Sequence, residues 1–341
     1  MSNERFGKII SREESIHNLP KVKPTSTGEN GESPVKEATP ATLDARFEAR
    51  HPKFKMTDVI LPESVRQEIR TLRSRIKNHD LIYREWGFEN IDRKGVNVAV
   101  SFYGPPGTGK TMCAEALASE LGQGILEVNY AEIESKYVGE TPKNIVAAFA
   151  AAKRSNAILF FDEADSILGR RLTNVTQSAD QAVNNSRSVM LKQLDAFEGI
   201  IIFATNLARN FDGAFVRRIL QHIYVSPPDE GCRLLLWKKM ISPKVPGFEL
   251  LDFGELARNS DGLSGGLIKN AALLSLSELA ECPHAERKLS VRSITQAIAC
   301  VRRSQQEVGT EHGTSRIISS ITEQVSEIAK PAQSLPTCSF Q

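Results

Sequence analysis

The sequence reads Gly104-Pro105-Pro106-Gly107-Thr108-Gly109-Lys110-Thr111 over one glycine-rich octet. The residues before it, 96–102, are mostly β-branched or apolar, and the residues after it, 112–118, are rich in helix formers. A strand, a glycine-rich loop and a helix in this order are typical of a loop that binds phosphate groups. We therefore expect the octet to bind a nucleoside triphosphate.

Each part of the octet has its own task in this interpretation. The glycines allow successive backbone N–H groups to point at the phosphates, next to the N-terminus of the following helix. Lys110 supplies a positive charge, and the Thr111 hydroxyl can coordinate Mg²⁺. The octet alone does not distinguish a kinase from a GTPase or a motor, so the rest of the chain must do so.

A second apolar segment ends in two acids. Residues 158–161 are Ile-Leu-Phe-Phe, and Asp162 and Glu163 follow them. The segment lies about fifty residues after the octet, as expected of a neighbouring parallel strand. Asp162 is expected to hold Mg²⁺ through water, and Glu163 to orient the water that attacks the γ-phosphate. Two acids can also mark a solvated strand end, but the octet favours the catalytic interpretation.

Two more polar groups follow apolar segments. Residues 200–204 predict a buried strand, and Asn206 after it is expected to contact the attacking water or the γ-phosphate. Arg217 and Arg218 stand at a predicted helix end, before the strand-like residues 223–225. An arginine here can stabilise transition-state charge from a neighbouring subunit, although such a pair can also be a solvated helix end.

Taken in order, these motifs resemble those of the AAA+ ATPases, and within them the classical AAA branch. The resemblance covers about residues 54–303. It implies an α/β fold, in which a P-loop NTPase parallel sheet with flanking helices is followed by a small all-α lid. It identifies the octet as Walker A, Asp162 and Glu163 as Walker B, and Asn206 as sensor 1.

The resemblance also assigns residues outside these motifs. Arg217 and Arg218 are similar to the paired arginine fingers of the spastin, katanin and endosomal-sorting ATPases. Gly265 falls in the sensor 2 region and is expected to contact nucleotide, while the role of Lys269 and Asn270 there stays open. Two residues before the first helix are expected to line the adenine pocket, namely Val59 and Ile60.

A substrate contact is implied as well. Tyr137, Val138 and Gly139 match the aromatic, hydrophobic and glycine triplet of the family's central pore loop. A rigid aromatic ring can grip an extended polypeptide at low entropic cost. Residues 173–185 are predicted to form a long polar connection, either a second pore loop with Arg170 and Arg171 or a solvated loop.

The predicted organisation has four parts. Residues 1–50 form a disordered or weakly ordered N-terminal arm, and residues 51–228 form the large α/β ATPase domain. Residues 229–305 form the helical lid, with helices expected at 234–237, 268–280 and 291–301, and residues 306–341 form a tail with one short helix at 317–328. The first helix is expected to start at Pro62.

Composition agrees with this organisation. The 341 residues are 40% hydrophobic and carry a formal net charge of +2, which gives no support for nucleic acid as a partner. The five cysteines, without metal-binding spacing, favour a reducing cytoplasm. No apolar stretch is long enough for a membrane span, so we expect a cytoplasmic protein without a membrane partner.

The function expected is a ring-shaped, homo-hexameric AAA+ motor. With ATP and Mg²⁺ as cofactors, it would hydrolyse ATP to unfold, thread or disassemble a protein substrate, presented directly or by an adaptor. The stretch before the arginines is also similar to the remodellers of HORMA-domain proteins, which gives one alternative. Microtubule severing and a nucleic-acid-directed AAA+ motor are further alternatives.

Overall fold

The computed structural model describes residues 47–92, 97–129, 133, 140–169, 178–206 and 211–309. The chain divides into two compact units. The first contains the described residues up to 236 together with 262–266, and the second contains 237–261 and those from 267 on. The four-part organisation expected from the sequence stays a prediction, and its residues 1–46 and 310–341 lie outside the described part.

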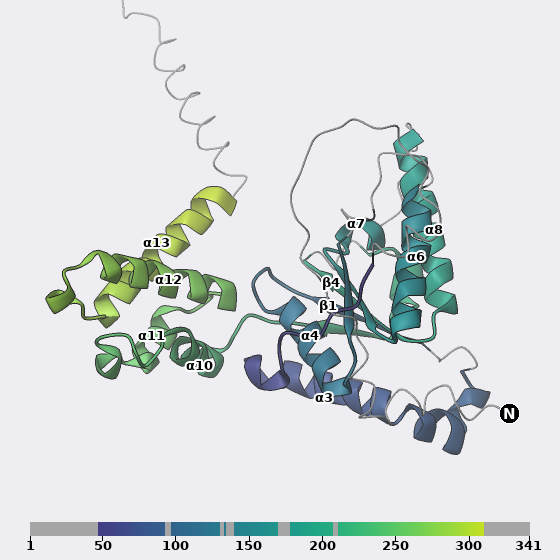
Figure 1. The fold of residues 1–341 in the computed structure, drawn as a ribbon, viewed down its shortest axis with the longest axis horizontal. Coiled ribbons are helices and arrows are strands. Elements are labelled where there is room, and N and C mark those ends of the chain that lie inside the picture. Colours follow the sequence, from purple (N-terminus) through teal and green to yellow (C-terminus); the bar gives the residue numbers. More distant parts are fainter. Residues whose placement is uncertain are drawn as a thin grey trace, which may run out of the picture. The chain divides into compact units, whose positions relative to one another are not determined.

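A parallel sheet forms the centre of the first unit (Figure 1). Its order is β2-β3-β4-β1-β5, so the first strand in sequence lies between the fourth and the fifth. The strands are β1 (Val98–Tyr103), β2 (Ile125–Asn129), β3 (Ile158–Asp162), β4 (Ile200–Thr205) and β5 (Gln221–Tyr224). This confirms the P-loop α/β fold that the resemblance to the AAA+ ATPases implies.

Helices cover both faces of the sheet (Figure 1). On one face, α3 (Glu63–Lys77) and α4 (Lys110–Leu121) pack against alternate strand residues such as Val100 and Ile202. On the other, α6 (Glu140–Ser155) and α8 (Ser178–Ala196) pack against the residues between them, such as Phe161. Because both faces are buried, the central strands β3 and β4 are nearly continuous apolar runs rather than alternating ones.

The starts of α3 and α8 differ from the expectation. Pro62 is the N-cap of α3, so the helix itself begins one residue later than expected. The polar connection predicted for 173–185 is wrong in its second half, because α8 already begins at Ser178. The first residues of α8 are polar and resemble a loop, whereas later residues of the helix, such as Met190 and Leu194, are fully buried. Residues 170–177, with Arg170 and Arg171, lie outside the described part.

Short elements connect the layers of the first unit. Residues 47–61 lie before α3 and reach both hydrophobic cores, with Phe47 buried in one core and Val59 and Leu61 in the other. The short elements are η2 (Met56–Asp58), the π-helical turn η3 (Leu81–Glu85), η4 (Phe88–Asn90), α7 (Asp165–Leu168) and α9 (Gly213–Val216). Among the helices that the structure describes, none combines the length and hydropathy that a bilayer crossing requires.

The second unit is helical. Helix α10 (Glu230–Met240) begins in the first unit and ends in the second. Trp237 on α10 is fully buried, and its indole N–H donates to Ser260 Oγ over 2.9 Å. The remaining elements are η6 (Phe248–Leu250), α11 (Phe253–Asn259), α12 (Gly265–Glu281), η7 (His284–Glu286) and α13 (Val291–Gly309).

Helix α11 was not expected from the sequence. It has only seven residues, too few for a clear apolar period. Its signal lies at the N-terminus instead. The Asp252 carboxylate accepts hydrogen bonds from the backbone N–H groups of Gly254 and Glu255, as an N-cap aspartate does.

The stacked pair of Phe161 and Phe203 generates a prediction about stability. The two rings lie 5.4 Å apart on neighbouring strands, and Phe203 is fully buried. Phe203→Ala should lower the free energy of unfolding by about 3–5 kcal/mol, because the central strand cannot close the cavity. Urea unfolding measures the change. The control is Val146→Ala, at a half-exposed position of α6, which should lower the free energy of unfolding by less than about 1 kcal/mol. Equal losses of stability in the two variants would contradict the prediction.

Candidate nucleotide site

The carboxyl ends of three neighbouring strands meet at one edge of the sheet. Strand β1 ends at Tyr103, paired with Thr205 of β4, and β3 pairs with β4 through Phe161 and Phe203. The octet therefore follows β1, Asp162 ends β3, and Asn206 follows β4, all at the same edge. Ligands of open α/β sheets bind outside the carboxyl ends, where the strand order reverses, and β1 lies at this point.

Close packing explains two glycines of the octet. Gly104 has φ +145°, and a Cβ there would lie 2.4 Å from the carbonyl oxygen of Val225. Gly107 has φ +75°, and a Cβ there would lie 2.7 Å from Ser264 Oγ. The carbonyl of Gly107 also accepts a hydrogen bond from the Gly266 N–H over 3.0 Å. The loop is thus held by contacts that only glycine permits.

Lys110 places a buried ammonium group inside the loop. Only 9% of the residue is exposed. Its Nζ donates to the carbonyl oxygens of Gly104 and Pro105, each over 2.9 Å, and to Asn206 Oδ1 over 2.7 Å. Burial lowers the pKa of Lys110, and the charges of Asp162 and Asp165 oppose this shift. All three acceptors are neutral, so an anion bound nearby would compensate the buried charge.

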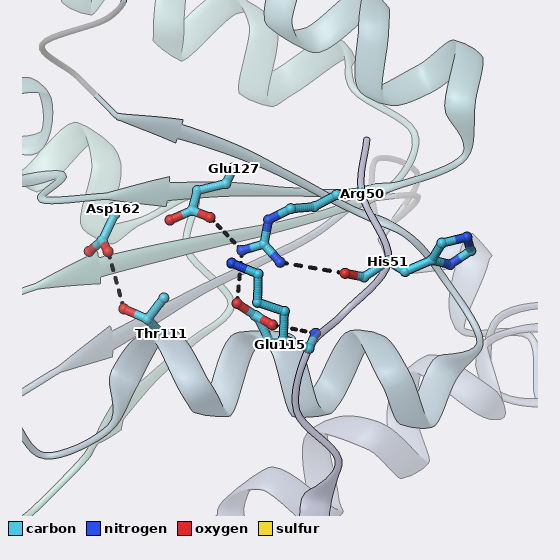
Figure 2. Close-up of polar contacts among 7 residues, drawn as sticks. Arg50, His51, Thr111, Glu115, Glu127 and Asp162 are labelled. Atoms are coloured by element: carbon cyan, nitrogen blue, oxygen red, sulfur yellow. Dashed lines mark hydrogen bonds and ion pairs between the residues drawn. The ribbon is translucent and has the colours of Figure 1, made fainter. Parts of the chain in front are cut away.

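Thr111 and Asp162 are in direct contact. Thr111, in the first turn of α4, donates from Oγ1 to Asp162 Oδ2 over 3.1 Å (Figure 2). The other carboxylate oxygen of Asp162 accepts the Glu163 N–H over 2.9 Å. A hydroxyl and a carboxylate are the oxygen donors that Mg²⁺ prefers, so this pair fits the metal expected from the sequence.

Glu163 and Asn206 follow their strands directly. Glu163 is exposed and has φ +50°, a left-handed conformation that is uncommon for a residue with a side chain. Such strain is found mainly at functional sites. Asn206 is also exposed, and it touches Lys110 through its Oδ1. The preceding Thr205 is buried and donates to Asp165, an acid that no sequence motif indicated.

The two arginines have different surroundings. Arg217 is exposed, and its Nε donates to the carbonyl of Gly213 within the same turn of α9. Arg218 donates with two nitrogens to both carboxylate oxygens of Asp195, over 2.8 and 3.0 Å, and this hydrogen bonding raises the pKa of Arg218. Asp195 lies on α8, far from Arg218 in sequence, and no motif predicted the contact.

The other residues expected at the site fall in three places. Val59 is buried in the core beneath the sheet, and Ile60 beside it is half-buried. Gly265 begins α12 next to Gly266, which contacts the octet, whereas Lys269 and Asn270 are exposed on the same helix. Tyr137 and Val138 lie outside the described residues, so the expected pore loop stays a prediction.

Comparison with known proteins agrees with this geometry. Residues 100–227 match the family described as "ATPase family associated with various cellular activities (AAA)". The chain is similar to the spastins of Homo sapiens and Gallus gallus, each 35% identical over 188 residues, which is 52% of this chain and 30% of theirs. The spastin of Drosophila melanogaster is 34% identical over 189 residues, or 52% of this chain and 24% of that protein.

The matched part of the chain spans about a third or less of the length of these relatives. It contains the whole sheet edge described above, from the octet to the two arginines. The family match and the geometry therefore rest on the same residues. Residues 100–227 thus match the AAA ATPase family, and this AAA region is similar to that of spastin.

Proposed function

We propose that this chain hydrolyses ATP in a Mg²⁺-dependent reaction and uses the energy to remodel a protein substrate within a ring of identical subunits. The observation that carries the ATPase part is the convergence of four side chains from three strand ends. Lys110 contacts Asn206, and Thr111 contacts Asp162, at the edge where the octet opens. This supports the binding of a triphosphate and its metal at one place.

The residues would divide the work as follows. Lys110 and the backbone N–H groups of residues 104–111 hold the phosphates, and Thr111 and Asp162 hold Mg²⁺. Mg²⁺ held by these two residues would neutralise the charge that develops on the phosphate oxygens. Glu163 orients the attacking water and accepts its proton, and Asn206 is placed by Lys110 to contact the γ-phosphate or that water.

Completion of the site by a neighbouring subunit is part of the proposal. Arg217 is exposed and touches only its own helical turn among the hydrogen bonds described, which suits a group that reaches another subunit. Arg218 is braced against Asp195 and would hold α9 in place. We assign the arginine finger first to Arg217. A finger supplied from outside makes ATP hydrolysis depend on assembly.

The protein-directed part rests on the family relationship. Tyr137 and Val138 would grip an extended segment of the substrate in a central pore, with six subunits around it. Disassembly of a HORMA-domain protein is the narrower alternative and shares all the residues named here. The similarity to spastin supports the class of motor, while the substrate and any adaptor have to be found by experiment.

Glu163→Gln should block hydrolysis and spare ATP binding. The amide keeps the size of the side chain and cannot accept the proton, so kcat should fall about a hundredfold or more. Phosphate release measures kcat, and a fluorescent ATP analogue measures binding. Glu89→Gln, at an exposed acid on η4, is the control with unchanged turnover. Normal hydrolysis by Glu163→Gln would contradict the role of this residue.

A mixing experiment tests the shared site. Rings of Arg217→Ala subunits alone and rings of Lys110→Ala subunits alone should both be inactive. Loss of the arginine should lower kcat about a thousandfold. Mixed together, they should recover activity, because an intact octet then meets an intact arginine from its neighbour. Arg217→Ala mixed with a subunit that carries both substitutions cannot complement and is the control. Activity no higher than this control would show that the arginine does not act between subunits.

Tyr137→Ala should separate hydrolysis from work on protein. Basal ATPase should stay within about threefold of the unsubstituted chain, because the aromatic ring grips substrate and does not touch nucleotide in this proposal. Remodelling should be lost. The substrate for the assay is the protein that Glu163→Gln rings retain in ATP and release on ATP removal. Normal remodelling of that protein by Tyr137→Ala would contradict the pore-loop assignment.

A further inference from the structure

Arg50 lies where the N-terminal segment crosses the edge of the sheet. Its backbone N–H donates to the carbonyl of Ile125 over 2.8 Å, and its own carbonyl accepts the Ile125 N–H over 2.9 Å. This antiparallel bridge attaches the segment to β2, the edge strand of the sheet among those described. The guanidinium then reaches across to α4, as Figure 2 shows.

Glu115 on α4 receives this guanidinium. Its side chain is 3% exposed, and its two oxygens accept from Arg50 over 2.8 Å and from the Lys53 N–H over 2.6 Å. Burial alone would raise the pKa of Glu115, but these hydrogen bonds outweigh it and lower the pKa. Glu115 is therefore a buried carboxylate with both oxygens paired. It lies one helical turn after Thr111, on the same side of α4.

Glu127 on β2 receives the same Arg50 nitrogen over 2.5 Å. Strand β2 is hydrogen-bonded to β3, with Glu127 opposite Phe160 and Asn129 opposite Asp162. Arg50 thus joins the helix that carries Thr111 to the strand beside the one that ends in Asp162. Figure 2 shows both contacts in one view, with Arg50 between Glu115 and Glu127 and with the Thr111–Asp162 pair at the start of the same helix.

We propose that Arg50 is a positioning residue for Mg²⁺, acting through Glu115 and Glu127 to keep Thr111 and Asp162 at a constant separation. The inference rests on the proposed function, because it takes these two residues as the metal ligands. Mg²⁺ demands near-ideal octahedral geometry, so small displacements of α4 from β3 weaken its binding. Partners that orient metal ligands typically change metal affinity when they are removed.

The variant Arg50→Met/Glu115→Gln tests the proposal. It removes the partly exposed charge of Arg50 and the buried charge of Glu115 together, and the glutamine keeps an oxygen for the Lys53 N–H, so no buried charge is left unpaired. Binding of a fluorescent ATP analogue is measured in EDTA and in rising Mg²⁺. The gain in affinity that Mg²⁺ provides should fall about tenfold or more, while affinity in EDTA stays within about twofold. The Mg²⁺ concentration for half-maximal ATPase should rise about tenfold, with the rate at saturating Mg²⁺ little changed.

The matched control removes another ion pair of the same helix. Arg73 on α3 contacts Glu120 of α4 over 3.1 Å. Glu120 lies more than one helical turn after Glu115 on the same helix. Arg73→Met/Glu120→Gln should leave the Mg²⁺-dependent gain unchanged. Arg50→Lys keeps the positive charge but loses the planar guanidinium, so the Mg²⁺-dependent gain in affinity should fall by an intermediate amount. This variant replaces the double variant if the latter does not fold.

The outcomes separate the two proposals. An unchanged Mg²⁺-dependent gain in folded Arg50 variants, or equal losses in the Arg73 control, would overturn the positioning role and leave Arg50 as a structural tie. If the unsubstituted chain binds no nucleotide with or without Mg²⁺, the proposed function itself fails, and this is seen before any variant is compared.

Discussion

Burial of the sheet on both faces determines where the polar groups of the site can lie. Strand residues such as Val100, Phe161 and Ile202 are enclosed by helices, so a charged side chain on either face would lose its hydration without compensation. Polar chemistry is therefore confined to the loops at the strand ends. Because β1, β3 and β4 run parallel, their carboxyl ends bring the octet, Asp162 and Asn206 to one edge. The site follows from the packing of the core.

Two buried charges have different roles, because one can bind a ligand and the other holds two elements of the fold together. Lys110 is hydrogen-bonded to three neutral oxygens, so its positive charge is solvated by dipoles and available to an anion. Glu115 is also buried, but both its oxygens are occupied, one by the Arg50 guanidinium and one by a backbone N–H. The first arrangement favours a ligand. The second holds a helix against a strand and leaves no oxygen without a partner.

Arg217 and Arg218 show the same division between a structural contact and an available side chain. They are adjacent in sequence and chemically identical, yet α9 directs them to different neighbours. Arg218 forms a two-pronged contact with Asp195, the geometry in which guanidinium and carboxylate bind most specifically. Arg217 remains exposed, and the one hydrogen bond described for its side chain goes to the Gly213 carbonyl of the preceding helical turn. Arg217 is the C-cap of α9 and Arg218 follows it, and their side chains have different described contacts, so one arginine can brace the element while the other serves a partner.

Local patterns in the sequence determined the strands, the phosphate loop and the helix after it. Apolar runs, turn residues and the octet are all contained in short windows, and their order carried the resemblance that implied the parallel sheet. The same kind of reasoning missed α11 and placed the start of α8 too late, because a seven-residue helix has little period and a polar helix start resembles a loop.

Only the tertiary structure decided which side chains meet across the fold. Arg50 contacts Glu115 and Glu127, which are 65 and 77 residues away in sequence, and Arg218 contacts Asp195, 23 residues away. No spacing rule connects such pairs. Their distances depend on how the sheet edge, the helices and the N-terminal segment pack, and packing energy is a property of the whole core rather than of any window of sequence.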